Sequence, residues 1–416
     1  CLLNCQHRTR RSSAVQKVSG IIQIVVIICY LFQIKKVYMK IKHLFLLLTA
    51  GVLLASSAAY LNVPTEVQAA RYSNSEAKQV IKFQKAYKDL DTINYDQDTL
   101  YLTKPNFASP FNPGVLDSIY INSSMDYLNY YRSLAGLPRE INRAKDNLDA
   151  QIGAAALAAV NAKTSLRAHG LLGYKRPEFI SKKNWEIAEN ATLGNVNFLE
   201  SDSGSTAGEI VTDLLKDENN IAGSGNTGHR ALILSARATR MGIGAAYGKN
   251  NGKFYSVENG VFADDILRKP VKNVVTYPSS QVFPYELSTS DTPWSAYFAN
   301  KRISRTPKVY ITDLTAKKKY RATHVRNFGT DYYGDGYSAA ISFKPSSSMK
   351  LVNTHKYQVK IAGVYTYSFR LFRQESTLKQ KSNPPKKNKK VKKSHHKKKS
   401  TRKVVKKRKT SHRHHR

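Results

Sequence analysis

The hydrophobic period of this chain changes near residue 280, and the change limits what the chain can fold into. Before that point the longest apolar patterns recur every three or four positions, as on the buried side of a helix, and "YLNYYRSLAGL" (127–137) is an example. Beyond it apolar and polar residues alternate, as on a strand with one buried face, and "KYQVKI" (356–361) is an example. The 416 residues are enough for two ordinary domains. The pattern therefore predicts a mixed α/β unit followed by an all-β unit.

The first unit is predicted to span residues 115–265. Its three predicted helices are "SSMDYLNYYRSLAGL" with a serine cap, the alanine-rich "DAQIGAAALAAVNAK" and "TAGEIVTDLLKDE". Its two predicted short strands are "MGIGAAYG" and "KFYSVENGVF". The alanines of the second helix allow another element to pack close to it. Residues 70–114 are predicted to be a lead-in with a short helix from Lys78 to Leu90, and residues 264–280 a linker.

The second unit is predicted to span residues 281–373. Its candidate strands are "PKVYITDL", "GYSAAISF", "KYQVKI" and "YTYSFRLF". Several short alternating strands separated by turn residues are typical of a β-sandwich. After it, residues 379–416 contain 19 Lys and Arg and no acidic residue, in a chain whose net charge is +38. Such a segment cannot bury a core, so the sequence predicts a disordered polycationic tail.

The beginning of the sequence has the features of an exported protein. Lys40 and Lys42 follow the first methionine, Met39, and an apolar run from Leu44 to Leu54 comes next, too short to span a bilayer. We therefore expect a signal peptide at 39–69, ending in "VQA", and we interpret residues 1–38 as an upstream extension. All three cysteines lie in that extension, so the mature chain would have none and no transmembrane anchor.

Two histidines of the first unit are candidates for a site. His229 ends the glycine-rich stretch "GSGNTGH" just before an apolar run, and His169 lies in "RAHGLL". Glycines let a loop fold tightly enough to place an imidazole where a helix face could not. Two neutral imidazoles are good ligands for zinc or another divalent metal, and nearby carboxylates can orient the rings.

Residues 115–265 resemble the CAP superfamily, also called the SCP-like or pathogenesis-related-1 proteins. The signs are the "YLNYYRSLAGL" helix, a histidine after the alanine-rich helix, the acid–asparagine pair in "EIAEN", and "GHR" before an apolar segment. The resemblance implies an α-β-α sandwich with a cleft lined by two histidines and two acids. Carried over, these are His169, Glu189 and His229, with Asp217 as the second acid and Asp213 and Glu218 as alternatives. Leu214 stands where the family has a tryptophan.

A second resemblance lies in the segments beyond the predicted linker. "YPSSQVFPYEL", "PWSAYF" and "GYSAAISFKP" resemble the Ig-like segment that follows the CAP unit in secreted proteins of lactobacilli. The predicted fold is thus a CAP α-β-α sandwich, an all-β Ig-like sandwich and a disordered basic tail.

Binding is favoured over catalysis as the function of the cleft. Nucleophilic hydrolysis needs a cysteine or serine beside a base, and no serine lies in an elbow motif. Asn190 is interpreted as structural, and Arg230 as either a partner of a cleft acid or a solvated charge. A small ligand or peptide is expected in the cleft. A metal-dependent hydrolase of an envelope polymer or peptide, and a surface adhesin, are kept as alternatives.

The basic tail predicts an anionic partner. No aromatic residue interrupts the lysines of residues 379–416, so there is no stacking platform for bases and nucleic acid is disfavoured. Behind a signal peptide the nearest polyanions of a Gram-positive envelope are teichoic acids. We therefore expect an extracellular, cell-wall-associated protein that is held electrostatically by its tail.

Overall fold

The computed structural model describes residues 72–200, 203–329, 333 and 336–375. The predicted upstream extension (1–38), signal peptide (39–69) and polycationic tail (379–416) lie outside the described residues. No helix within the described ranges is long and apolar enough to cross a membrane.

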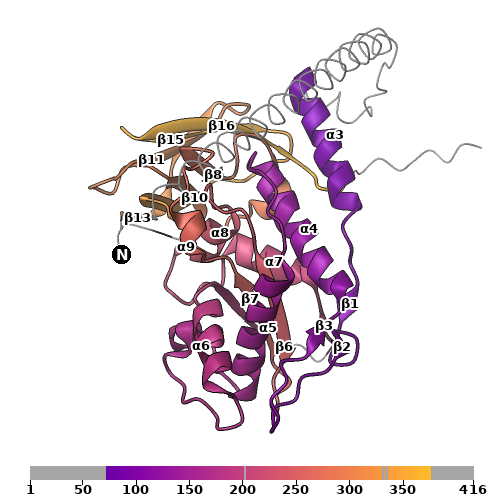
Figure 1. The fold of residues 1–416 in the computed structure, drawn as a ribbon. Helices are drawn as coiled ribbons and strands as arrows, with labels where there is room; N and C mark the ends of the chain where they lie inside the picture. Colours follow the sequence, from indigo (N-terminus) through magenta and orange to yellow (C-terminus); the bar gives the residue numbers. More distant parts are fainter. Residues whose placement is uncertain (1–71, 201–202, 330–332, 334–335, 376–416) are drawn as a thin grey trace, which may run out of the picture. The chain divides into compact units, whose positions relative to one another are not determined.

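The first half of the described chain forms three layers (Figure 1). The middle layer is an antiparallel sheet in the order β4 (Asn195–Leu199), β7 (Phe254–Asn259) and β6 (Gly242–Tyr247). One face packs against α5 (Ala144–Ala159) and α6 (Lys182–Ala191), and the other against α4 (Ser118–Leu134) and α7 (Ala207–Lys216). This arrangement agrees with the predicted α/β unit.

The ends of these helices follow from their capping residues. Thr206 and Glu209 form a capping box at the start of α7, and the predicted apolar stripe of that helix is buried. The predicted serine cap of α4 is wrong, because the helix begins earlier and Asp117 accepts the capping hydrogen bond from Ile119. Ser124 instead lies inside α4 and donates to the Tyr120 carbonyl.

Helix α5 lies unusually close to strand β6. A side chain at Gly244 would approach the Ala150 carbonyl to 2.2 Å, and one at Gly242 would approach the Asp146 carbonyl equally closely. The alanines of α5 and the glycines of β6 therefore allow the two backbones to pack together, as the alanine-rich helix predicts.

The second half is all β-structure. One sheet has the order β13 (Thr323–Phe328), β14 (Ala339–Lys344), β10 (Trp294–Phe298) and β8 (Val274–Tyr277); the other has β12 (Lys318–Arg321), β11 (Val309–Asp313), β15 (Lys356–Ile361), β16 (Tyr365–Phe372) and β9 (Gln281–Pro284). The ring of Trp294 meets that of Phe369 at 5.3 Å, so the two sheets face each other. The predicted strands are present, but the segment predicted as a linker contains β8.

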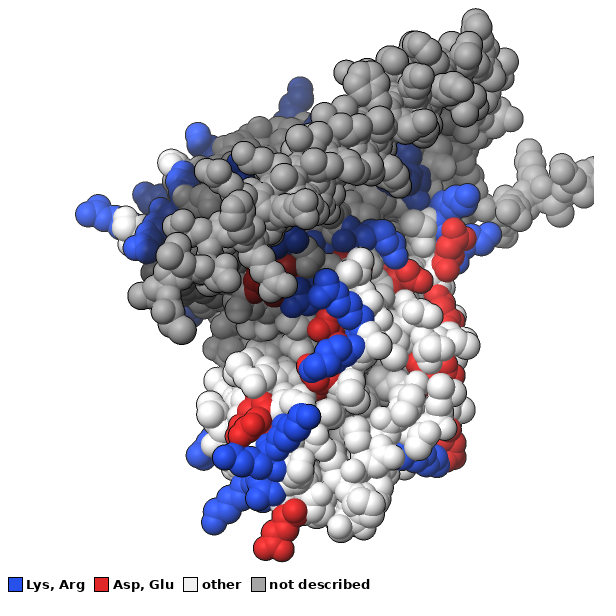
Figure 2. Space-filling model, viewed as in Figure 1, with Lys and Arg blue, Asp and Glu red and all other residues white. Residues whose placement is uncertain are grey.

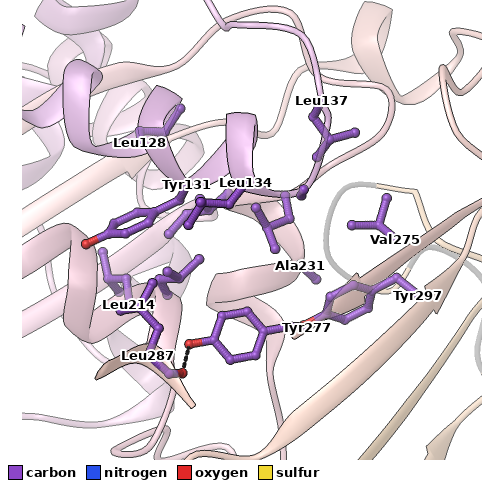
Figure 3. Close-up of a cluster of buried hydrophobic side chains, with 14 of the residues drawn as sticks. Leu128, Tyr131, Leu134, Leu137, Leu214, Ala231, Val275, Tyr277, Leu287 and Tyr297 are labelled. Carbon is purple, nitrogen blue, oxygen red and sulfur yellow. Dashed lines mark hydrogen bonds between the residues drawn. The ribbon is translucent and has the colours of Figure 1, made fainter. Parts of the chain in front are cut away.

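A single hydrophobic core joins the all-β part to the α/β layers. Side chains from helices α4, α7 and α8 (Gly228–Ile233) pack against strands β8 and β10 (Figure 3). In that view they are Leu128, Tyr131, Leu134, Leu214 and Ala231 on the helices and Val275, Tyr277 and Tyr297 on the strands. Tyr277 also donates a hydrogen bond to the Leu287 carbonyl. The two predicted units are therefore packed directly on each other.

The predicted lead-in is also part of the fold. Its helix α3 (Asn74–Lys88) packs on the all-β part, where Phe83 stacks with Phe372 at 6.3 Å and Tyr72 donates to the Leu371 carbonyl. The remaining short elements are β1 (Asn94–Tyr95) paired with β5 (Ser205–Thr206), β2 (Tyr101–Thr103) paired with β3 (Val115–Leu116), the 3-10 helices η1 (Leu166–Leu171) and η2 (Tyr285–Leu287), and α9 (Ala263–Ile266).

Charged side chains of both signs are mixed on the visible face of the α/β layers. Around α5 and α6, Lys and Arg lie among Asp and Glu with uncharged surface between them (Figure 2). This view therefore shows no single basic surface on these layers, in contrast to the charge that the sequence concentrates at 379–416.

Candidate functional site

A cavity of about 360 Å³ lies between η1, the loop before β4, the end of α7 and the start of α8. Three of the predicted site residues line it: His169 from η1, Asp217 from the end of α7, and His229 from α8. These residues are far apart in the sequence, so the tertiary fold brings them together.

His169 is positioned by a kink in η1. The backbone leaves helical geometry at His169, and Gly170 follows with a φ of 62°, a value that favours glycine. The ring Nδ1 lies 3.0 Å from the Thr192 carbonyl, so it is the protonated nitrogen of the neutral ring. Burial lowers the pKa of His169, and a charge on His229 lowers it further, so His169 is neutral at neutral pH.

Asp217 holds His229 in place. One carboxylate oxygen accepts a hydrogen bond from His229 Nδ1 at 2.8 Å, and the other accepts from the Arg230 backbone N–H at 3.0 Å. Asp217 is 3% exposed and caps α7 in the left-handed region, with a φ of 55°. Burial disfavours protonation of His229, but the Asp217 carboxylate outweighs it, so the pKa of His229 is raised.

The loop before His229 is held by the all-β part. Gly223 and Gly225 have φ values of 118° and 78°, which fits the predicted need for glycine here. The Thr227 N–H donates to the Tyr333 hydroxyl at 2.8 Å, and the Tyr297 hydroxyl donates to the Thr227 carbonyl at 3.1 Å. Tyrosines of the second unit therefore fix the loop that carries a cavity histidine.

Arg230 points away from the cavity. Its fully buried guanidinium donates to the carbonyls of Leu215 and Pro293 at 2.6 Å and lies 3.8 Å from the Tyr277 ring centre. It is neither a solvated charge nor the side-chain partner of a cleft acid, which are the two predicted roles. Arg230 instead joins α8 to the all-β part.

Glu189 and Asn190 do not line the cavity. Both lie near the end of α6, where the Glu189 carbonyl accepts a hydrogen bond from the Thr192 hydroxyl. Asn190 is exposed, donates to the Glu186 carbonyl, and borders a separate cavity of about 200 Å³. Glu189 and Asn190 are thus close in the chain to Thr192, whose carbonyl holds the His169 ring. Their own side chains, however, lie outside the cavity.

The two alternative acids are placed differently. Asp213 lines the cavity and accepts hydrogen bonds from the amides of Asn197 at 2.8 Å and Asn219 at 3.0 Å. Glu218 faces the all-β part, where it accepts from Thr292, and it does not line the cavity.

Glu258 is a buried acid that the sequence analysis missed. It lies on β7, accepts a hydrogen bond from the Asn195 amide at 3.0 Å, and has a second carboxyl oxygen with no hydrogen-bond partner among the described residues. Burial raises its pKa to about 7, although Asn195 and His229 both lower it. β7 is the central strand and is covered on both faces. An acidic residue within its apolar pattern is therefore the feature of the sequence that could have indicated a buried acid.

The two imidazoles fit part of a metal site. Each Nδ1 already has an oxygen partner, which is the arrangement that orients a metal-binding ring. Within the described ranges, however, no three His, Cys, Asp or Glu side chains are placed to share one ion. These residues therefore do not make a closed structural zinc site, which takes four protein ligands.

The fold and the site define a three-layer α-β-α protein with two histidines and two aspartates in one cavity. Residues 125–259 match the family model described as the cysteine-rich secretory protein family, CAP. The match covers about a third of the chain and supports the CAP superfamily for this segment, although the three cysteines of the sequence all lie outside it. No curated protein matches the chain.

Proposed function

We propose that the chain is an exported binding protein of the CAP type, whose cavity takes a small ligand or peptide. The observation that carries this proposal is that His169, Asp217 and His229 line one cavity, with both Nδ1 atoms engaged by protein oxygens. Both rings line the cavity, so a ligand that enters it meets them. A concave site with a few oriented polar groups is the usual form of a ligand pocket.

We propose that zinc or another divalent metal can bind in the cavity as an ion shared by the two imidazoles and the ligand. Two imidazoles would supply two positions, and water or the bound ligand would complete the coordination. Such an ion would bind weakly without the ligand.

The test uses the full chain with isotope-labelled histidine. Soluble fragments of a Gram-positive cell wall are titrated with and without zinc, and the ring signals are followed by NMR. We expect the signals of His169 and His229 to move and that of His355 to stay. His355 is a matched control, because its Nδ1 also lies 2.8 Å from an aspartate, Asp313, but it does not line the cavity.

A double variant completes this test. His169→Ala/His229→Ala should lose the response to wall fragments, whereas His355→Ala should keep it. The double variant has no labelled histidine in the cavity, so its binding is measured by calorimetry with wall fragments free of teichoic acid. If wall fragments move neither ring signal of the natural chain, or bind the double variant equally tightly, the proposal is wrong.

We also propose that residues 379–416 hold the protein at the cell wall through teichoic acids. The support is the concentration of half of the net charge in about a tenth of the chain. Counter-ion release makes such binding weaken steeply with salt. About 1 M LiCl should release the protein from cells, and deletion of residues 379–416 should release it without salt. Retention in both cases contradicts the tether.

Export itself is proposed from the segment 39–69. If a signal peptidase cuts after "VQA", the extracellular protein begins at about residue 70. Sequencing the amino terminus of the protein recovered from cells decides this. An intact terminus upstream of Met39 would argue against it.

The all-β part is proposed to be an Ig-like sandwich that supports the cavity. Two facing sheets, and tyrosines that hold the loop of His229, support this role. The hydrolase and adhesin alternatives have different outcomes. Turnover of wall fragments that is lost in the double variant would indicate the hydrolase, and binding to host surfaces that survives it would indicate the adhesin.

A further inference from the structure

The cavity is acidic, although the protein is strongly basic. Asp213 and Asp217 line it, and none of the lining residues in the described part of the chain is a lysine or arginine. The chain as a whole carries a net charge of +38. The cavity therefore differs in sign from the net charge of the chain, which bears on the charge of what it binds.

The charge of Asp217 is already matched. Its oxygens accept from the His229 ring, from the Asn220 amide at 2.9 Å and from the Arg230 backbone N–H. Because the pKa of His229 is raised, this pair carries little net charge when the ring is protonated.

The charge of Asp213 is matched only in part, by the nearby His229 ring, whose pKa Asp213 helps to raise. The two oxygens of Asp213 each accept one amide hydrogen bond, from Asn197 and Asn219, and no basic side chain in the described ranges forms an ion pair with it. A carboxylate has about four acceptor positions, so two remain. Asp213 is half-buried at the cavity wall, where a cationic group of a ligand would meet a carboxylate that the amides already orient.

Aliphatic side chains surround the same cavity. Leu166 from η1, Leu193 from the loop after α6 and Ile221 from the loop after α7 all line it, and each is about half exposed, at 51%, 53% and 48%. Single exposed aliphatic residues are common on protein surfaces. Here three separate segments bring one each to the same opening, which provides an apolar surface for a ligand.

We propose that the cavity binds a ligand that joins an aliphatic body to an ammonium or guanidinium group, with Asp213 as the partner of the cation. This is the chemistry of a lysine or arginine side chain or of an alkylamine. The inference rests on the proposed function, and it names the class of ligand for that cavity. Anionic ligands are disfavoured, because Asp213 and Asp217 are two carboxylates in a cavity where the His229 ring, whose pKa they both raise, can supply only one positive charge.

The experiment compares three probes with the same aliphatic chain: hexylamine, hexanol and hexanoate. Each is titrated into the full chain near neutral pH, and the ring signals of His169 and His229 report binding. A charge-assisted hydrogen bond is about twice as strong as a neutral one. We therefore expect hexylamine to bind about fivefold to tenfold more tightly than hexanol, and hexanoate to bind least.

Asp213→Asn tests the residue directly. The variant keeps the size of the side chain and removes its charge, so hexylamine should fall to the affinity of hexanol, which should change little. Asp126→Asn is the matched control, because Asp126 is an exposed aspartate on α4 that pairs with Arg139. It should leave the order of the three probes unchanged.

Several outcomes would overturn the inference. Equal binding of amine and alcohol, tightest binding of hexanoate, or a preference for amine that survives Asp213→Asn would each do so, while any ring response would still support a ligand cavity. If no probe moves either ring signal, this class of ligand is wrong. The wall-fragment titration then decides separately whether the cavity binds at all.

Discussion

One carboxylate, Asp217, sets the charge of His229. The folded pKa of His229 is raised, so the pair stabilises the fold fully below the ordinary pKa of histidine, about 6.5, and this contribution is lost as pH rises through the folded pKa. Asp217→Asn should therefore destabilise the protein more at about pH 6 than at about pH 9, by an amount on the order of 1 kcal/mol. Denaturant unfolding at both pH values measures the difference.

Asp313→Asn is the control for this prediction. It removes the equivalent contact to His355, outside the cavity, at the same 2.8 Å distance. A penalty for Asp217→Asn that is the same at both pH values would show that the carboxylate acts only through hydrogen bonds.

The contribution of Glu258 to the free energy of unfolding should change with pH in the opposite direction to that of an ordinary surface carboxylate. Its folded pKa is about 7, above its unfolded value, so the folded state loses stability as pH rises between about 4.5 and 7. Glu258→Gln removes this titration. Relative to the natural protein, the variant should gain up to about 3 kcal/mol between about pH 4 and pH 8. Unfolding curves across this range test it, and a constant difference would contradict it.

The histidines of the cavity could be predicted from sequence, whereas parts of its surroundings could not. His169 and His229 stand in recognisable order relative to helices, and Asp217 is predicted on the third helix, whose end it caps in the structure. Glu258 was missed because the strand pattern of "KFYSVENGVF" says which residues are buried but not that one of them is an acid. Glu189 illustrates the reverse, because a motif fixes the position of a residue in the chain but not the direction of its side chain.

Between elements, α5 and β6 approach each other so closely that only glycine fits at the contact. Gly244→Ala would place a methyl group 2.2 Å from the Ala150 backbone, which cannot move without shifting the helix. We expect a loss of about 2–4 kcal/mol in the free energy of unfolding, or failure to fold. Chemical denaturation measures it.

Gly363→Ala is the control at this scale. A methyl group there would meet nothing within 4 Å, so the change introduces only the strain of a φ of 71°, about 1 kcal/mol. Equal losses in the two variants would mean that the packing of α5 on β6 is not limiting.

The sequence predicts that most of the helices and strands exist, but it predicts less well the residues at which they begin and end. The alternation in "KYQVKI" and "YTYSFRLF" corresponds to β15 and β16, since apolar residues that face a core must repeat with the strand. Helix α4 starts at Ser118 rather than at its predicted serine cap, because Asp117 is the better-placed acceptor. The sequence predicts a linker where strand β8 lies, because the burial of this strand depends on α4 and α7, which no local pattern reveals.

For the whole molecule, one hydrophobic core spans the α/β layers and the all-β part (Figure 3). The two should therefore unfold together. The sequence has two tryptophans: Trp185 lies on α6, in a second core cluster on the other face of the α/β sheet, and Trp294 lies between the two facing sheets. Trp185→Phe and Trp294→Phe each leave one reporter, and their fluorescence transitions should coincide in denaturant.

Circular dichroism of the same variants provides the control, because it reports on both parts at once. Transitions that are separated in denaturant concentration would show two independent domains, and the tyrosine contacts to the loop of His229 would then be too weak to couple them.

Helix α3 has a practical consequence for anyone who trims this protein for expression. Phe83 and Tyr72 pack on Phe372 and Leu371, near the opposite end of the described chain. A fragment cut at the limits of the family match, 125–259, would begin in the middle of α4 and would strip apolar partners from both ends of the shared core. The shortest piece that we expect to stay soluble therefore runs from residue 72 to residue 375.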